Sequence, residues 1–140
     1  KECQIVKKTV ILLAALLMLL SFASCSGTIK SGEAKEQIRN YFDAVEEKDY
    51  ALADTFLHPD SAIESEVFFG ELESKRNFDC SNIEIERYTG FSTTLYSSTV
   101  RGTTYSLKMD AIIGDEPVAL EVQLVKNRNG FGINSILIRF

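Results

Sequence analysis

The sequence predicts an α+β domain in which three N-terminal helices pack on an antiparallel sheet. Apolar residues recur at helical spacing from Glu33 to about Lys75. After Asn77 apolar and polar residues alternate, and β-branched and aromatic residues become frequent. A helical half followed by a sheet half is typical of α+β proteins, in which helices cover one face of the sheet.

The first 24 residues have the three-part order of an export signal. Lys1, Lys7 and Lys8 precede an unbroken apolar run from Val10 to Leu20, and small or polar residues follow it. The run is shorter than the roughly 20 residues that span a bilayer, and it falls within the roughly 7 to 15 residues of a secretory signal. We therefore interpret residues 1–24 as a signal peptide that is absent from the mature chain.

The run Phe22-Ala23-Ser24-Cys25 resembles the lipobox of bacterial lipoproteins, with phenylalanine in place of the usual leucine. The resemblance implies cleavage before Cys25 and acylation of its thiol, which anchors the exported protein at the outer face of the cell membrane. Such a cysteine carries more than one acyl chain, and two chains give stable anchoring where one is marginal. Cleavage after Ala23 is the alternative, because Ser21 and Ala23 form a small pair, and it would give a freely secreted protein.

The three cysteines bear on this choice. Cys3 leaves with the signal and Cys25 takes the lipid, so Cys80 is left as the one thiol of the mature chain. If cleavage followed Ala23, Cys25 and Cys80 would be able to form a disulfide. The sequence contains no Cys-x-x-Cys spacing of a metal or redox site. A free Cys80 therefore favours the lipoprotein interpretation.

The mature chain is acidic and long enough for one domain. The signal holds three of the 15 basic and one of the 20 acidic residues, which leaves 116 residues with a net charge of −7. This charge argues against nucleic acid as a partner, because phosphate binding needs a basic surface. Residues 25–32 are small and polar and predict a flexible tether. Residues 33–140 then form a single α+β domain.

The helical half predicts three helices. An amphipathic pattern covers residues 33–48. Asp49 is a suitable N-cap for a short second helix, which Pro59 ends because proline disfavours helical backbone at the preceding residue. The run Ser61-Ala62-Ile63-Glu64 has the spacing of a capping box, which predicts a third helix from there to about Lys75.

The sheet half predicts five strands joined by short turns. Two of the turns are Gly114-Asp115-Glu116-Pro117 and Asn129-Gly130. The predicted strands, in order, are residues 82–89, a Thr/Ser-rich segment around Leu95, Tyr96 and Val100, residues 104–113, a segment from Val118 to Leu124, and residues 131–140.

The order of these elements resembles the nuclear-transport-factor-like fold, a cone-shaped scaffold shared with ketosteroid isomerase and scytalone dehydratase. The run IRNYFDAVEEKDYALADTFLHPDS, residues 38–61, is similar to its opening helices, and NGFGINSILIRF, residues 129–140, to its last hairpin. Many small bacterial lipoproteins of unassigned function resemble the same fold. The resemblance covers most of residues 34–140 and implies a sheet that curves around a pocket.

The same resemblance implies where pocket residues lie. Tyr41 takes the place of the tyrosine that holds the oxyanion in the isomerase, and Glu121 resembles the acid of a later strand. The place of the catalytic aspartate falls on Ser65, whose neutral hydroxyl cannot serve as a carboxylate base without further activation. Apart from the resemblance, a pocket mouth or ordinary cross-strand pairing would explain one set of residues on the predicted strands: Tyr88, Tyr96, Arg101 and Tyr105. We therefore expect no isomerase activity, with an isomerase-like or dehydratase-like enzyme as the alternative.

The function that we expect is non-enzymatic binding, without a cofactor or a metal. The ligand would be a small apolar molecule, a peptide, a partner protein or a second copy of the chain. Self-association through the sheet is suggested by the last strand, which predicts apolar side chains on both faces. Ile136, Ile138 and Phe140 alternate there with Ile133 and Leu137.

Two polar features have simpler explanations than a ligand-binding or metal-binding site. His58 is the one histidine of the chain and is predicted at a helix C-terminus, where it interacts well with the helix dipole. The acidic residues between Glu64 and Asp79 are scattered along a helix that also holds Lys75 and Arg76. They are typical of a solvated helix face rather than of a cation site.

Overall fold

A computed structural model describes residues 27–140, so the predicted signal peptide, the predicted lipobox and the predicted lipid attachment at Cys25 lie outside the described part of the chain. Three helices precede a sheet, as predicted. The helices are α2 (Ser31–Glu46), α3 (Tyr50–Asp54) and α4 (Ser65–Arg76). The strands are β1 (Ile83–Ser97), β2 (Gly102–Ile113), β3 (Glu116–Asn127) and β4 (Gly130–Arg139). The α+β class is therefore confirmed.

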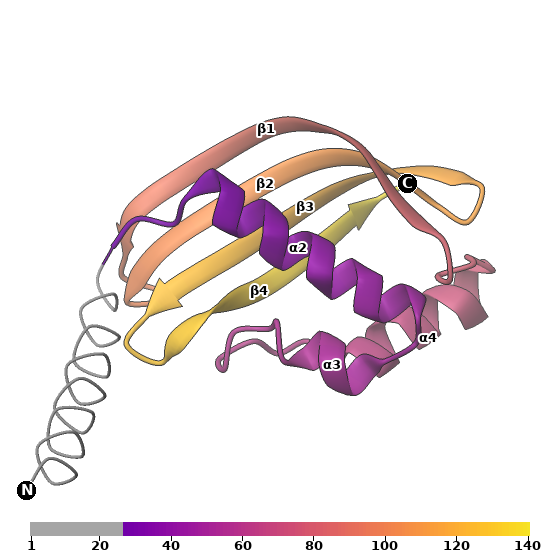
Figure 1. The fold of residues 1–140 in the computed structure, drawn as a ribbon, viewed down its shortest axis with the longest axis horizontal. Helices are drawn as coiled ribbons and strands as arrows, with labels where there is room; N and C mark the ends of the chain where they lie inside the picture. Colours follow the sequence, from indigo (N-terminus) through magenta and orange to yellow (C-terminus); the bar gives the residue numbers. More distant parts are fainter. Residues whose placement is uncertain (1–26) are drawn as a thin grey trace, which may run out of the picture.

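The four strands form one antiparallel sheet in chain order, β1-β2-β3-β4. Each strand pairs with the next through a tight turn, and the β2–β3 register runs without interruption from Thr103↔Lys126 to Ile113↔Glu116. The sheet is curved, and α2 crosses one of its faces while α3 and α4 lie beyond β4 and below α2 in the view (Figure 1).

The core lies between α2 and the face of the sheet that it crosses. Strand alternation directs Leu107 and Met109 of β2, and Leu120 and Val122 of β3, into this core, where each is at most 2% exposed. The apolar stripe predicted for the first helix is buried as well. Its members are Ala34, Ile38, Tyr41, Phe42 and Val45.

The packed part of the chain begins earlier than the sequence predicts. Helix α2 starts at Ser31, and the side chain of Ile29 is only 4% exposed and belongs to the core. Both residues fall within the segment 25–32 that was predicted to be a tether. The described residues thus leave very little free chain between the fold and position 25.

The predicted capping box is wrong. Helix α4 begins at Ser65, and Glu64 at the N-cap position makes no side-chain cap hydrogen bond. The hydroxyl of Ser61 donates instead to the carbonyl of Asn134 in β4, at 2.9 Å. A tertiary hydrogen bond therefore takes the hydroxyl that the local pattern assigned to a helix end.

The second helix is also shorter than predicted. Asp49 caps it as expected, because its carboxylate accepts from the backbone N–H of Leu52 at 3.1 Å, but α3 ends at Asp54. The chain then runs beside β4. The N–H of Ile133 donates to the carbonyl of Phe56 at 3.0 Å, and the N–H of His58 donates to the carbonyl of Ile133 at 2.7 Å. Residues 56–58 thus form a short parallel extension of the sheet.

The two predicted strands around residues 82–89 and 95–100 are a single strand, β1, and Val100 lies in the turn that follows it. Strand β1 pairs with β2 along its whole length, with three register shifts. These bulges absorb the irregular pattern that suggested a break, because an extra residue in one strand disturbs alternation without ending the ladder. The sheet therefore has four strands rather than five.

The prediction that the last strand is apolar on both faces is wrong. A register shift opposite Gln123 and Leu124 places Ile133 beside Leu124 and Ile136 beside Val122, so both isoleucines face the core. A bulge of this kind changes the face of every residue beyond it. The outward face of β4 keeps Leu137, which is 48% exposed among polar neighbours.

Candidate functional site

The structure brings together two of the four residues that the sequence analysis places in a possible pocket, Tyr41, Ser65, Tyr105 and Glu121. The hydroxyls of Tyr41 in α2 and Ser65 at the start of α4 form a hydrogen bond of 2.9 Å. Both residues are 0% exposed. The backbone N–H of Ser65 also donates to the carboxylate of Asp54 at 3.3 Å, which ties the start of α4 to the end of α3.

The surroundings of this pair are aromatic. The ring centroid of Tyr41 lies 5.4 Å from that of Phe42 and 6.2 Å from that of Phe69. Burial raises the pKa of Tyr41 to about 12, against a smaller lowering by the Ser65 hydrogen bond. A phenol held in its neutral form and bonded to a serine is a packed core pair.

The other two predicted residues lie elsewhere. Glu121 alternates along β3 with two core residues and points to the opposite face of the sheet, where its carboxylate is 3.6 Å from the guanidinium of Arg139. Tyr105 is 5% exposed on the helix-facing side, and its ring stacks on Phe91 of β1 at a centroid distance of 6.0 Å. No carboxylate from β3 therefore reaches Tyr41.

A different part of the fold forms a large polar cleft. One end of the sheet, which we call the hairpin end, holds three segments (Figure 1). They are the turn 98–101 between β1 and β2, the turn 128–129 between β3 and β4, and residues 27–30. A cleft of about 930 Å³ opens there. Its lining residues are His58, Asp60, Thr99, Val100, Arg101, Val125, Asn127, Arg128, Asn129 and Asn134.

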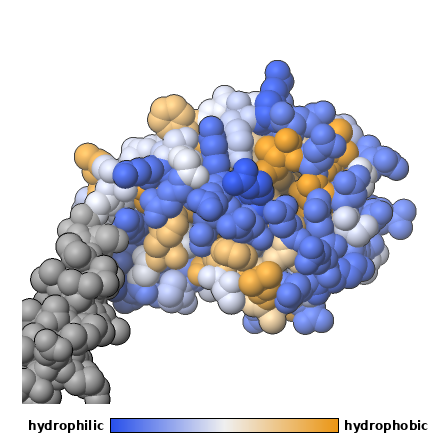
Figure 2. Space-filling view, viewed as in Figure 1, coloured by the Kyte–Doolittle hydropathy of each residue, from blue (hydrophilic) through white to orange (hydrophobic). Residues whose placement is uncertain are grey.

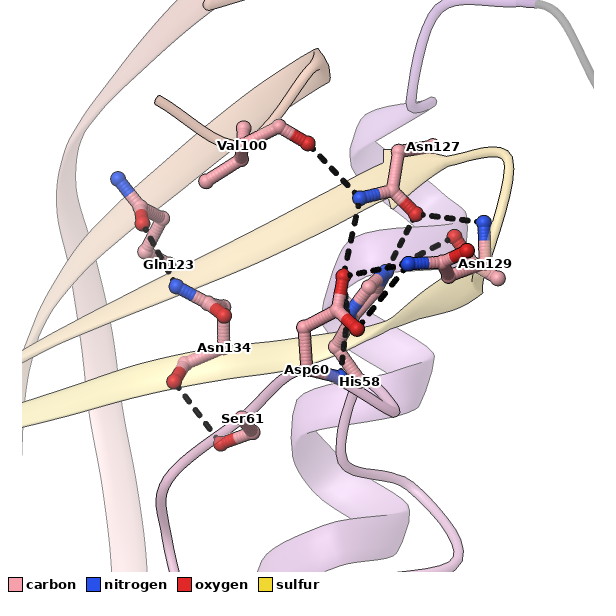
Figure 3. A network of polar contacts seen from close by, with 9 residues as sticks. His58, Asp60, Ser61, Val100, Gln123, Asn127, Asn129 and Asn134 are labelled. Atoms are coloured by element: carbon pink, nitrogen blue, oxygen red, sulfur yellow. Dashed lines mark hydrogen bonds and ion pairs between the residues drawn. The ribbon is translucent and has the colours of Figure 1, made fainter. Parts of the chain in front are cut away.

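His58 forms the floor of this cleft, and its side chain is 0% exposed. Its Nδ1 accepts from the backbone N–H of Asp60 at 3.0 Å, so the ring proton is on Nε2. Nε2 then donates to the side-chain oxygen of Asn127 at 2.9 Å and to the carbonyl of Gly130 at 3.2 Å (Figure 3). Both ring nitrogens are thus occupied by hydrogen bonds within the protein.

Asn127 joins three segments that line the cleft, which are residues 58–60, the turn 98–101 and the turn 128–129. Its side-chain oxygen accepts from His58 and from the backbone N–H of Asn129, at 2.9 Å each. Its NH₂ group donates to the carbonyl of Val100 at 2.8 Å and to the carboxylate of Asp60 at 3.4 Å (Figure 3). One amide therefore fixes the two hairpin turns and the chain after α3 relative to one another.

Asp60 is held at the exposed rim of the same network. The NH₂ group of Asn129 donates to both carboxylate oxygens, at 3.1 and 3.0 Å. These bonds are the largest cause of a lowered pKa of Asp60, and the hydrogen bond from Asn127 lowers it further. The carboxylate is therefore charged at neutral pH and is already occupied by protein donors.

Cations surround this network. Arg101 and Arg128 line the cleft, and a second cleft of about 400 Å³ beside it adds Lys126 together with Gly27 and Tyr96. Arg101 has a left-handed backbone with φ of 53°. A residue with a Cβ is uncommon in this conformation, where glycine or asparagine is usual.

The chemistry of the cleft suits binding rather than catalysis. The imidazole of His58 is buried with both nitrogens bonded, so it has no free nitrogen to move a proton to or from a ligand. Arginine side chains and amide groups, in contrast, bind carboxylates and phosphates through several hydrogen bonds. Among residues 27–140 no group of three or more His, Cys, Asp or Glu side chains is arranged to hold a metal ion.

The sequence also made predictions about the surroundings of His58 and Cys80. The prediction that His58 interacts with a helix C-terminus is wrong, because α3 ends four residues earlier at Asp54. Cys80 has no disulfide partner among residues 27–140 and is buried at 1% exposure. Burial raises its pKa to about 11, so the thiol is protonated at neutral pH.

No helix in the described residues has the length and apolar character needed to cross a membrane.

Most of the cleft was missed at the level of sequence. The available signal was that polar residues cluster at chain reversals, with Asp60 after Pro59, and Asn127 and Asn129 around the last turn. Their meeting depends on which turns share an end of the sheet, and the local pattern does not contain that information.

No family model matches the sequence, and neither a curated protein nor a solved structure is significantly similar to it.

Proposed function

We propose that the protein is an exported lipoprotein, anchored in the membrane through acylated Cys25, whose domain is a non-enzymatic binding module. We also propose that the domain is a variant of the nuclear-transport-factor-like cone. Three helices before a curved antiparallel sheet, and a last hairpin at residues 129–140, support this assignment.

The observation that carries the non-enzymatic part is the closed pair Tyr41–Ser65. In the isomerase the equivalent positions hold a tyrosine and a carboxylate base around an open pocket. In this chain the two hydroxyls bond to each other at 2.9 Å with no exposed surface. The carboxylate beside this pair, that of Asp54, accepts from the backbone N–H of Ser65, and neither hydroxyl has surface that a substrate would reach, so the interior acts as a core.

The binding surface that we propose is the hairpin end. Its larger cleft is lined by arginine, asparagine and threonine side chains, with Val100 and Val125 as the apolar members. This lining favours a polar, anionic partner over the small apolar ligand that the sequence suggests. The network of His58 and Asn127 supports such a role, because it holds the cleft walls in place without using the arginines.

Acyl labelling tests the anchor. Cells that express the full chain are fed an alkyne-tagged fatty acid, and the purified protein is examined for the tag. The wild-type chain and the control variant Cys80→Ser should carry the label, and Cys25→Ser should not. Labelling that persists in Cys25→Ser, or is absent from the wild type, would exclude the proposed attachment site.

An enzyme assay tests the proposal that the domain is non-enzymatic. The purified protein should not isomerise a Δ5-3-ketosteroid above the rate of its Tyr41→Phe variant. Turnover that depends on Tyr41 would overturn the non-enzymatic assignment.

A further inference from the structure

We propose that the hairpin end docks on anionic lipid headgroups of the membrane that holds the anchor, which gives the domain a fixed orientation. This inference rests on the proposed acylation of Cys25. It adds a partner and a binding surface, because an anchored domain on a free tether would have no preferred side toward the bilayer.

Chain connectivity places the anchor close to this surface. Gly27 lines the second cleft of the hairpin end together with Tyr96 and Arg101. Two residues of extended chain span about 7 Å, so the acylated residue at position 25 lies within about 7 Å of Gly27. Gly27, at the edge of the second cleft, is therefore held within about a Debye length of the anchored residue, about 8 Å at physiological salt.

The charge of the hairpin end is opposite to that of the rest of the domain. Lys30, Arg101, Lys126 and Arg128 are its cations. Asp60 is the acidic residue that lines its clefts, and Glu33 in the first turn of α2 adds one more negative charge. This end is thus positive, although residues 25–140 together carry −7.

An anionic surface acts on this asymmetry in two ways. It attracts the basic end, because lysine and arginine side chains near the membrane surface gain favourable interaction with anionic lipids. It also repels the acidic remainder of the domain. Both effects favour the orientation in which the hairpin end meets the headgroups.

Exposed apolar side chains complete the surface. Leu95 and Tyr96, at the end of β1, are 68% and 67% exposed. Figure 2 shows hydrophobic side chains reaching the surface at the left of the view, over β1, beside hydrophilic ones. Tyrosine is enriched at membrane interfaces, because its ring is apolar and its hydroxyl reaches the headgroups. Basic and aromatic side chains on one rigid end are typical of a surface that lies on a membrane.

A tryptophan reporter tests the docking directly, because the chain contains no tryptophan. The mature Tyr96→Trp variant, extracted from membranes, is reconstituted into vesicles of phosphatidylcholine alone or with phosphatidylglycerol, in each case with brominated acyl chains as quencher. We expect at least twofold stronger quenching of this hairpin-end reporter in the anionic vesicles. The variant Phe140→Trp carries a far-end reporter, at the opposite end of the sheet, which should be quenched weakly in both (Figure 1).

Charge reversals supply the matched comparison. Arg101→Glu with Arg128→Glu, added to Tyr96→Trp, should reduce quenching of the hairpin-end reporter to the level seen in phosphatidylcholine. Lys75→Glu with Arg76→Glu, the same change of charge at the end of α4, should leave the quenching unchanged.

Flotation of the vesicles separates the possible failures. Suppose that the protein floats with both vesicles, but the hairpin-end reporter is quenched no more than the far-end reporter, or equally in both lipids. The docking is then overturned, and the anchor is intact. Protein that floats with neither overturns the anchor, and the docking with it.

Discussion

The hydroxyls of Tyr41 and Ser65 satisfy each other at a position where water is absent. Each would otherwise be a buried polar group without a partner, which costs more than the hydrogen bond itself gains. The pair therefore keeps two polar groups in a core formed by α2 and α4. Because its hydroxyl is bonded to Ser65, Tyr41 is able to lie in a packed interior.

A double-mutant cycle measures this coupling. Ser65→Ala leaves the hydroxyl of Tyr41 unpartnered and should lower the free energy of unfolding by about 1–3 kcal/mol. Tyr41→Phe should have a cost in the same range, and the double variant should cost clearly less than the sum, since neither hydroxyl is then left alone. Urea denaturation of the four proteins provides the values. Additive costs would mean that the two hydroxyls do not depend on each other.

The pH dependence of stability follows from the raised pKa of Tyr41. In the unfolded chain the phenol ionises near its ordinary value of 10, whereas in the fold it keeps its proton up to about 12. The unfolded state therefore releases the proton first, and the contribution of Tyr41 to stability, which is complete below pH 10, is lost between pH 10 and 12, at up to about 1.4 kcal/mol per pH unit. Urea midpoints at several pH values should show a smaller loss for Tyr41→Phe than for the wild type. Equal slopes for the two proteins would contradict the assignment.

At the scale of elements, side-chain amides hold the hairpin end together. Asn127 bonds to the floor residue His58, to Val100 in the β1–β2 turn and to Asn129 in the β3–β4 turn. The segments that carry Arg101 and Arg128 are therefore fixed by a residue that is not itself part of the basic surface. This arrangement is typical of a site in which a supporting layer positions the groups that bind.

Loss of this amide should loosen the hairpin end. Asn127→Ala removes a partner of the buried His58 and should lower the free energy of unfolding by about 1–3 kcal/mol. Asn129→Ala is the matched control, because its side chain is exposed and water can replace its bonds to Asp60; its cost should be below about 1 kcal/mol. Urea denaturation measures both. A control that costs as much as Asn127→Ala would show that Asn127 is not the central residue.

The parallel extension at residues 56–58 depends on a glycine. A Cβ at Gly132 would lie 2.6 Å from the backbone nitrogen of His58 and from the carbonyl carbon of Leu57, so the two segments would have to separate. Gly132→Ala should therefore cost about 1–3 kcal/mol of stability. Gly90→Ala in β1, where a Cβ would meet nothing within 4 Å, should cost less than about 1 kcal/mol. Thermal unfolding of both variants checks the difference, and equal costs would contradict it.

Local patterns predicted the elements whose reasons are local. The stripe around Ile38 and Tyr41 and the cap at Asp49 follow from spacing, and both are present. The hairpin turn predicted at Asn129-Gly130 is present one residue earlier, at Arg128-Asn129, with Gly130 as the first residue of β4. The failures depend on contacts between distant segments. Ser61 was assigned to a helix end, although its hydroxyl bonds to β4.

The candidate site depends on such distant contacts even more strongly. Tyr41 and Ser65 were named through a family resemblance, and their bond to each other was not foreseen. The network of His58 and Asn127 joins residues 69 positions apart, which no local pattern contains. The bulge that turns Ile133 toward the core is likewise invisible in an alternating sequence.

At the scale of the whole molecule, the proposed account joins a covalent anchor to an electrostatic surface. The packed chain begins at Ile29, so the domain has almost no slack relative to position 25. The basic hairpin end is the part nearest to that position, and the acidic excess of the chain lies elsewhere. An anchor at Cys25 and docking through Arg101 and Arg128 therefore support each other.

The most direct test of this account is the mass of the mature N-terminus. Protein extracted from the membranes of cells that express the full chain is digested, and its first peptide is analysed by mass spectrometry. We expect a peptide that begins with Cys25 and carries acyl chains. A soluble protein that begins with Ser24, with an unmodified Cys25, would contradict it.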